Sequence, residues 1–157
     1  MNTAAVAAPE APPALRISRL FPATPDRVFD AFTKPEILGR WWGPEGFTLP
    51  EVEVDPREGG GYRFAMLSSE GNTYNLSGRY LEIRRPERLV FTWAWDEGDM
   101  AGVETRVTLE FTAHDDATVL TLTHEGLPTE AQRDGHNQGW TSSFVRLGDT
   151  FDGGDGS

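Results

Sequence analysis

The stretch FPATPDRVFDAFTKPEILGRWWG, residues 21–43, decides the fold, because it encodes two short helices one after the other. Thr24 is a strong N-cap residue, and Pro25 stands at the first helical position, where its fixed φ favours the turn. Pro35 disfavours helical geometry at the residue before it, so a second helix must begin there. We therefore predict two consecutive short helices between strands.

A pair of tryptophans marks the end of the second helix. Gly43 and Pro44 follow it as a stop signal, since glycine adopts the left-handed cap and proline prevents the helix from resuming. Two interpretations of Trp41 and Trp42 are open: one indole forms the lid or mouth of a cavity, or both indoles seal the end of the core. In either case we expect only one of the two to be fully buried.

Segments that alternate apolar and polar residues flank these helices. Strands are expected at 15–21, 47–55, 61–68, 73–83, 88–95, 103–112 and 117–125. Glycine, proline, asparagine and aspartate clusters separate the later segments, which is typical of the turns of an antiparallel meander. The apolar residues of 73–83 change from one face to the other, which indicates a bulge near Gly78.

The final segment, 129–151, changes to helical spacing. One stripe along it is predicted to face inward: His136, Trp140, Phe144, Leu147 and Phe151. Thr129 and Gln132 match a capping box, but glycines within the helix lower its propensity by up to ~1 kcal/mol each, so tertiary contacts must hold it. The order of elements predicts an α+β helix-grip fold. In it, a curved antiparallel seven-stranded sheet surrounds a long C-terminal helix, with two short helices after strand 1.

Composition indicates one domain and excludes several functions. The 157 residues predict a single domain at 15–151, a disordered lead at 1–14 and a flexible tail at 152–157. The chain has no cysteine, which excludes disulfides and thiolate chemistry. Its net charge of -11 argues against nucleic acid or a membrane surface as partner. Without a signal peptide or a long apolar span, we expect a cytoplasmic protein.

Strand parity predicts which side chains face the interior. On 103–112 the odd positions, which are apolar except for Thr105, are predicted to face inward. On 117–125, Leu120 and Leu122 mark the inner face, and His124 has the same parity. The predicted ligand-binding residues are Trp41, Trp42, Tyr62, Phe64, Trp93, Trp95, Leu109, His124, His136, Trp140 and Phe144. The acidic residues Glu51, Glu53, Asp55, Asp96, Glu97 and Asp99 are interpreted as solvated surface.

The two inward histidines are predicted to meet. His136 lies roughly 10 Å into the last helix, which matches about three residues counted back along the strand to His124. As a pair they could bind a polar ligand group or act as acid and base. We favour the alternative that His136 caps the inward stripe of the helix and His124 is a hydrogen-bonded part of the pocket wall, since the sequence fixes no third ligand and no orienting carboxylate. We accordingly predict no metal site, no cofactor and no catalytic residue.

Several short motifs, taken in order, are similar to those of a known family. They are Thr24-Pro25 with Val28-Phe29 and Ala31-Phe32, Pro35-Glu36 with Trp41-Trp42-Gly43-Pro44, Gly59-Gly60, Gly78-Arg79-Tyr80, Pro86-Glu87-Arg88-Leu89 with Phe91-Thr92-Trp93, and Gly139-Trp140. Over about 15–151 the chain resembles the domain of the activator of heat-shock protein 90 ATPase, in the START-like (SRPBCC) superfamily of the birch-pollen allergen. The resemblance implies a helix-grip fold with a hydrophobic cavity beside the C-terminal helix, and no single reaction.

Three functions are expected, in descending order of preference. The first is a small-molecule binding protein whose aromatic cavity holds an apolar or amphipathic ligand. The second, implied by the resemblance and compatible with the acidic surface, is a module that interacts with a chaperone. The third is a cyclase, dehydratase or hydrolase type of enzyme that uses the inward histidines and tyrosines.

Overall fold

The computed structural model describes residues 14–43, 45–98 and 100–152. The predicted lead and tail, apart from residues 14 and 152, lie outside this range, as do Pro44 and Asp99. The elements are β2 (Leu15–Phe21), α1 (Pro25–Thr33), α2 (Pro35–Trp41), β3 (Thr48–Val54), β4 (Gly61–Leu67), β5 (Thr73–Arg84), β6 (Arg88–Trp95), β7 (Thr105–His114), β8 (Ala117–Glu125) and α3 (Glu130–Asp152).

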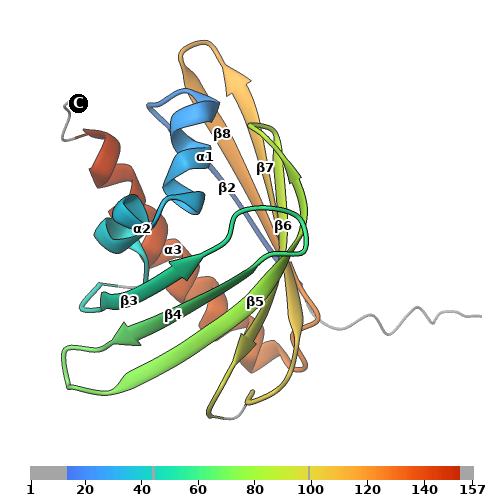
Figure 1. The fold of residues 1–157 in the computed structure, drawn as a ribbon. Coiled ribbons are helices and arrows are strands. Elements are labelled where there is room, and N and C mark those ends of the chain that lie inside the picture. The colour runs from blue at the N-terminus through green and yellow to red at the C-terminus, as the bar shows by residue number, and fades with distance from the viewer. Residues whose placement is uncertain (1–13, 44, 99, 153–157) are drawn as a thin grey trace, which may run out of the picture.

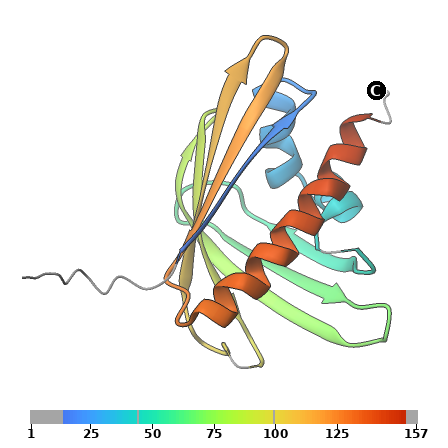
Figure 2. The same ribbon diagram turned by 180° about the vertical axis from the view of Figure 1, so that it is seen from behind.

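The strands form one antiparallel sheet that curves around α3. Within the described residues it has seven strands in the order β2-β8-β7-β6-β5-β4-β3, so the first strand pairs with the last. Figures 1 and 2 show α3 running diagonally across the concave side of the sheet, with its N-terminal end near the loop that joins β6 to β7. The predicted helix-grip fold is confirmed. None of the described helices is both long and apolar enough to cross a bilayer.

The two short helices begin at the prolines that predicted them. Pro25 opens α1 after an extended Thr24, and Pro35 opens α2 directly after Lys34. The side chain of Thr24 makes no capping hydrogen bond, so the predicted cap position is right although its hydroxyl does not cap the helix. Trp41 is the last residue of α2, and the backbone of Trp42 is already extended.

The long helix α3 packs its predicted stripe against the sheet. Trp140, Phe144 and Leu147 are buried, whereas His136 and Phe151 at the two ends are half-buried. The predicted capping box is only half formed. The hydroxyl of Thr129 accepts the backbone N–H of residue 132 at 3.1 Å, but no reciprocal bond is made. Tertiary packing therefore provides most of the stability of α3, as the glycines in its sequence predict.

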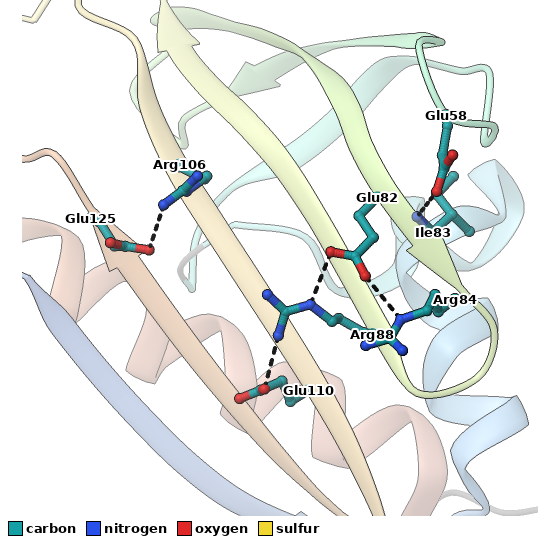
Figure 3. Close-up of polar contacts among 8 residues, drawn as sticks. All are labelled: Glu58, Glu82, Ile83, Arg84, Arg88, Arg106, Glu110 and Glu125. Atoms are coloured by element: carbon teal, nitrogen blue, oxygen red, sulfur yellow. Dashed lines mark hydrogen bonds and ion pairs between the residues drawn. The ribbon is translucent and has the colours of Figure 1, made fainter.

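The convex outer face of the sheet is covered by ion pairs (Figure 3). Arg88 bridges Glu82 at 3.1 Å and Glu110 at 2.9 Å, and Arg106 meets Glu125 at 3.4 Å. Such exposed pairs each contribute only about 0–1 kcal/mol to stability, because water competes for both partners. The inner face carries the apolar core.

The expected bulge lies slightly beyond Gly78, because the pairing of β5 with β6 shifts register between Tyr80 and Glu82. Gly78 is required for a different reason. A β-carbon there would lie 2.1 Å from the carbonyl oxygen of Thr92 and 2.7 Å from the ring of Tyr62. The Tyr62 hydroxyl crosses Gly78 to donate a hydrogen bond to that same oxygen. The glycine thus lets an inner aromatic ring bond the neighbouring strand.

We expect Gly78→Ala to lower the free energy of unfolding by about 3 kcal/mol, because the added methyl group collides with backbone that cannot move freely. Urea denaturation monitored by tryptophan fluorescence measures the change. Gly61→Ala is the matched control: its β-carbon would meet only the Gly78 oxygen at 3.5 Å, an ordinary contact. Equal stability of the two variants would contradict the steric account.

Candidate functional site

An aromatic cavity of about 420 Å³ lies between the inner face of the sheet and the N-terminal half of α3. Its walls come from β4, β5, β6 and α3 and from the segments that follow α2 and β6. The lining residues are Trp42, Gly43, Phe47, Met66, Tyr74, Trp93, Trp95, Glu97, Met100, Gln132, Gly135, His136, Gly139, Trp140 and Ser143. Small-molecule sites typically enclose about 300–1,000 Å³, so the cavity is large enough to hold a ligand.

A second hollow of about 460 Å³ lies near the turn between β5 and β6. Two of its arginines are already paired, Arg88 with Glu110 at 2.9 Å and Arg84 with Glu82 at 2.9 Å. A ligand there would have to displace these partners, and the hollow has no aromatic wall comparable to that of the first cavity. The aromatic cavity is therefore the candidate site.

The two adjacent tryptophans have different roles. Trp41 is sealed in the core, where its Nε1–H donates to the carbonyl oxygen of Ala31 at 3.0 Å. Trp42, turned by its extended backbone, packs between the sheet and α3, with ring centroids 5.9 Å from Trp93 and 5.6 Å from Trp140. Trp41 is fully buried, at 0% exposure, whereas Trp42 keeps 4%, so the expectation that only one of the two would be fully buried is confirmed. Only Trp42 lines the cavity.

The predicted meeting of the two histidines is confirmed, since the ring centroids of His124 and His136 lie 5.2 Å apart. The indole N–H of Trp140 donates to Nδ1 of His124 at 3.2 Å, so His124 must carry its own proton on Nε2. That Nε2–H donates to the hydroxyl of Thr105 at 2.8 Å, which in turn donates to the carbonyl oxygen of Trp93 at 3.1 Å. His124 therefore ties α3 to the sheet.

His136 is fixed by a parallel arrangement at the cavity wall. The indole N–H of Trp95 donates to its Nε2 at 3.1 Å, so the imidazole proton is on Nδ1. Nδ1–H donates to the backbone carbonyl oxygen of Gln132 at 2.7 Å, one helical turn earlier. Both imidazoles thus accept from an indole, which a protonated imidazolium cannot do.

The environment of the pair keeps both imidazoles neutral. Burial, with a smaller contribution from the neighbouring His136, lowers the pKa of His124 to about 3. Burial also lowers the pKa of His136, although its bond to the Gln132 carbonyl opposes that shift. The structural interpretation of the pair therefore has more support than an acid–base one.

The segment after α2 is attached to α3 by Arg146. Its guanidinium donates to the carbonyl oxygens of Gly43 and Phe47, each at 3.0 Å, and the N–H of Glu45 donates to the hydroxyl of Ser142 at 2.9 Å. Gly43 adopts a φ of 94°, which a residue with a side chain rarely does. These bonds hold the ring of Phe47 in the cavity wall.

Among the described residues that line the cavity, the carboxylate is that of Glu97, at the rim. This side chain is exposed, and its two oxygens accept the backbone N–H of Asn75 at 3.0 Å and its side-chain amide at 3.2 Å. Those hydrogen bonds lower the pKa of the Glu97 carboxyl. Its neighbour Asp96 instead pairs with Arg63 at 3.4 Å. Asp96 and Glu97 are exposed, as expected for solvated surface. The sequence did not predict that Glu97 also lines the cavity.

Two polar atoms at the wall have no partner. Among the described residues, the buried side-chain nitrogen and oxygen atoms without a hydrogen bond are Nε1 of Trp93 and Oε1 of Gln132. Both residues line the cavity. Because buried polar groups are nearly always paired in native proteins, the location of both exceptions beside one cavity is typical of a functional site.

The structure brings five of the predicted site residues to the cavity: Trp42, Trp93, Trp95, His136 and Trp140. Six others face the interior but pack outside its walls: Trp41, Tyr62, Phe64, Leu109, His124 and Phe144. Among the described residues, no group of three or more histidine and acidic side chains is placed to hold a metal ion.

The lining residues outside the predicted set come from three kinds of element. Four lie in connecting segments, although Phe47 was expected to begin the strand 47–55: Gly43, Phe47, Glu97 and Met100. Two lie on strands, Met66 and Tyr74, and four on α3, Gln132, Gly135, Gly139 and Ser143. Gly135 and Gly139 give a sequence signal for the cavity, because two glycines on the sheet-facing side of a helix leave space unfilled. The sequence analysis interprets Gly135 only as a weak helix former, and Gly139 also as part of the Gly139-Trp140 motif.

A curved antiparallel sheet that grips a long C-terminal helix, with an aromatic cavity between them, defines a domain of the helix-grip class. The model of one family, described as Activator of Hsp90 ATPase homolog 1-like protein, matches residues 22–152. The chain therefore belongs to this family, as the sequence motifs indicate.

Solved structures of bacterial proteins share this fold over most of the chain. Protein CV1439 from Chromobacterium violaceum is 30% identical, with a TM-score of 0.80 over 88% of this chain and 97% of that one. The AHSA1 protein SPO3351 from Silicibacter pomeroyi is 30% identical, with a TM-score of 0.81 over 89% and 98%. CalU16 from Micromonospora echinospora is 28% identical, with a TM-score of 0.67 over 86% and 73%. The comparison with curated proteins found no match.

The histidine geometry predicts a loss of stability in mild acid. A histidine whose pKa is lower in the folded state binds fewer protons there than in the unfolded chain, so acid favours unfolding. His124 alone should cost about 2 kcal/mol at pH 5 relative to pH 8, beginning as the pH falls through about 6.5. Urea denaturation between pH 8 and 5 measures this.

His114→Gln, which removes an exposed histidine at the end of β7, should keep that pH profile. His124→Gln should flatten it, whatever the variant's absolute stability. A wild-type profile that stays level from pH 8 to pH 5 would contradict the assignment of two neutral, indole-bonded imidazoles.

Proposed function

We propose that this domain binds a small apolar or amphipathic molecule in the cavity beside α3. The observation that carries the proposal is the cavity itself, about 420 Å³ in volume and walled by four tryptophans. Large aromatic groups provide extensive apolar contact area with few rotatable bonds, which favours binding a ligand over collapse of the wall. The expected cytoplasmic location stays a prediction.

The polar groups around the cavity support the same function. Apolar walls with a few polar groups are the usual composition of small-molecule sites. Here Ser143 and Gln132 from α3 and Glu97 at the rim supply those groups within an otherwise aromatic lining. A ligand that is mostly apolar and has a single polar end fits this distribution best.

An interaction with a chaperone is the second candidate. It is supported by the name of the matching family and by the net charge of -11, which would complement a basic surface. Retention of a purified Hsp90-type chaperone on the immobilised domain at low salt, and its loss at high salt, would support this candidate. No retention at either salt concentration would end it.

An enzyme of the cyclase, dehydratase or hydrolase type has less support. His124 does not line the cavity, and His136 has both ring nitrogens engaged in hydrogen bonds. A general acid or base must be able to reach the substrate proton directly or through one water. Neither imidazole is free to do so in this arrangement.

A thermal-shift screen of uncharged hydrophobic compounds tests binding. A ligand at about 100 times its Kd should raise the Tm by roughly 5 °C or more, because only the folded state binds it. We expect Gly135→Leu to abolish these shifts. A β-carbon at Gly135 meets no atom within 4 Å, so leucine can enter the cavity, and it also improves helix propensity.

Gly39→Leu is the matched control. Gly39 lies in α2, its β-carbon also meets nothing within 4 Å, and it does not line the cavity. This variant should keep every shift seen in the wild type. If no compound raises the Tm of the wild type, or if Gly135→Leu responds like Gly39→Leu, the proposed binding site is wrong.

A further inference from the structure

We propose that the ligand is a lipophilic cation, an aromatic or aliphatic molecule with an amine or quaternary ammonium group, whose charge is held at the cavity rim by Glu97. The inference rests on the proposed function and adds the charge class of the ligand. It depends on three properties of the described lining residues: they carry a fixed negative charge, they include no cationic side chain, and several of them are aromatic.

The negative charge is fixed in place. Both carboxylate oxygens of Glu97 accept hydrogen bonds from Asn75, one from its backbone and one from its side chain. Those bonds favour the ionised form of the carboxyl group. Asn75 lies on β5, and its carbonyl oxygen accepts the N–H of Asp96, so the rim at this point is bound to the sheet. A charge held in one position can select a ligand geometrically.

The carboxylate of Glu97 makes no ion pair with any residue that the structure describes, whereas the adjacent carboxylate of Asp96 pairs with Arg63. Each oxygen of an ionised carboxylate can accept more than one hydrogen bond, so Glu97 keeps acceptor capacity for a ligand. An ammonium group is the complementary partner for such a group.

The wall offers no positive charge of its own. Among the described lining residues, Glu97 is the only one with an ionised side chain, because the indole of Trp95 holds His136 neutral. A carboxylate or phosphate ligand would therefore meet a negative rim without a compensating cation. The net charge of -11 reinforces this selection against anions over a longer range.

The aromatic faces complete the argument. In the sequence, Tyr74 directly precedes Asn75, and Trp95 lies two residues before Glu97, which contacts Asn75. Tyr74, Trp95 and Glu97 all line the cavity. Aromatic rings carry negative potential on their faces and attract cations, most strongly where water is excluded, which is how aromatic cages recognise quaternary ammonium groups. An aromatic cavity with one carboxylate at its rim is therefore suited to an apolar cation.

Three probes of the same shape but different charge test the inference. They are benzyltrimethylammonium, its neutral isostere neopentylbenzene and the anion phenylacetate, each titrated by calorimetry. We expect the cation to bind the wild type at least about tenfold more tightly than the neutral isostere, and phenylacetate to bind more weakly than either. Raising the salt concentration should weaken the binding of the cation and of no other probe, since salt screens the charge at the exposed rim.

Glu97→Gln keeps the shape of the side chain and an oxygen that can accept from Asn75. It should weaken binding of benzyltrimethylammonium about tenfold and change neopentylbenzene by less than about twofold. Asp96→Asn is the matched control in the same loop and should leave both affinities within about twofold. Thermal melting of each variant without ligand checks that the fold is retained.

The outcomes separate the two proposals. If neopentylbenzene binds as tightly as the cation, or if Glu97→Gln leaves the cation's affinity unchanged, the charge inference is overturned while small-molecule binding stands. If phenylacetate binds most tightly, the charge inference is likewise overturned. If no probe binds and the screen of uncharged compounds also gives no shift in Tm, both the charge inference and the proposed small-molecule binding are wrong.

Discussion

The contact on which the rest of the structure depends is the docking of α3 through Trp140. Its indole N–H bonds His124 on the sheet at 3.2 Å, and its ring lies 5.1 Å from that of Trp93 and 5.6 Å from that of Trp42. Sheet, helix and the segment after α2 thus meet at one side chain. The helix α3 contains several glycines and depends on tertiary packing for its stability. The contact through Trp140 therefore fixes how far the helix lies from the sheet.

On either side of that contact the helix is packed differently. Toward its C-terminus, Phe144 lies edge-on to Phe21 with ring centroids 5.7 Å apart, and a β-carbon on Gly148 would meet the same phenylalanine ring at 3.8 Å. Toward its N-terminus, a β-carbon on Gly135 would meet nothing within 4 Å. The C-terminal half of α3 is therefore packed closely, whereas space is left beside its N-terminal half, where the cavity lies.

The fold could be predicted almost completely from sequence, because prolines, turn residues and periodicity are local signals that act directly on the backbone. The meeting of His124 with His136 followed from counting residues along a strand and a helix. The cavity was harder to place. Parity shows that Leu109 and Phe144 face inward, but not whether the space in front of them is filled. That depends on how far the helix stands from the sheet, which only the packed structure reveals.

The same hydrogen bonds that stabilise the fold also determine the chemistry of the cavity. An imidazole is the only neutral side chain with a donor on one ring nitrogen and an acceptor on the other, so each histidine can link an indole N–H to an oxygen acceptor across an apolar region. His136 performs this role in the wall, and the bond from Trp95 holds it there without a charge. Protonation of His136 would break that bond and place a positive charge among buried rings. The wall consequently stays neutral at physiological pH, and the electrostatic character of the site is left to Glu97 at its rim.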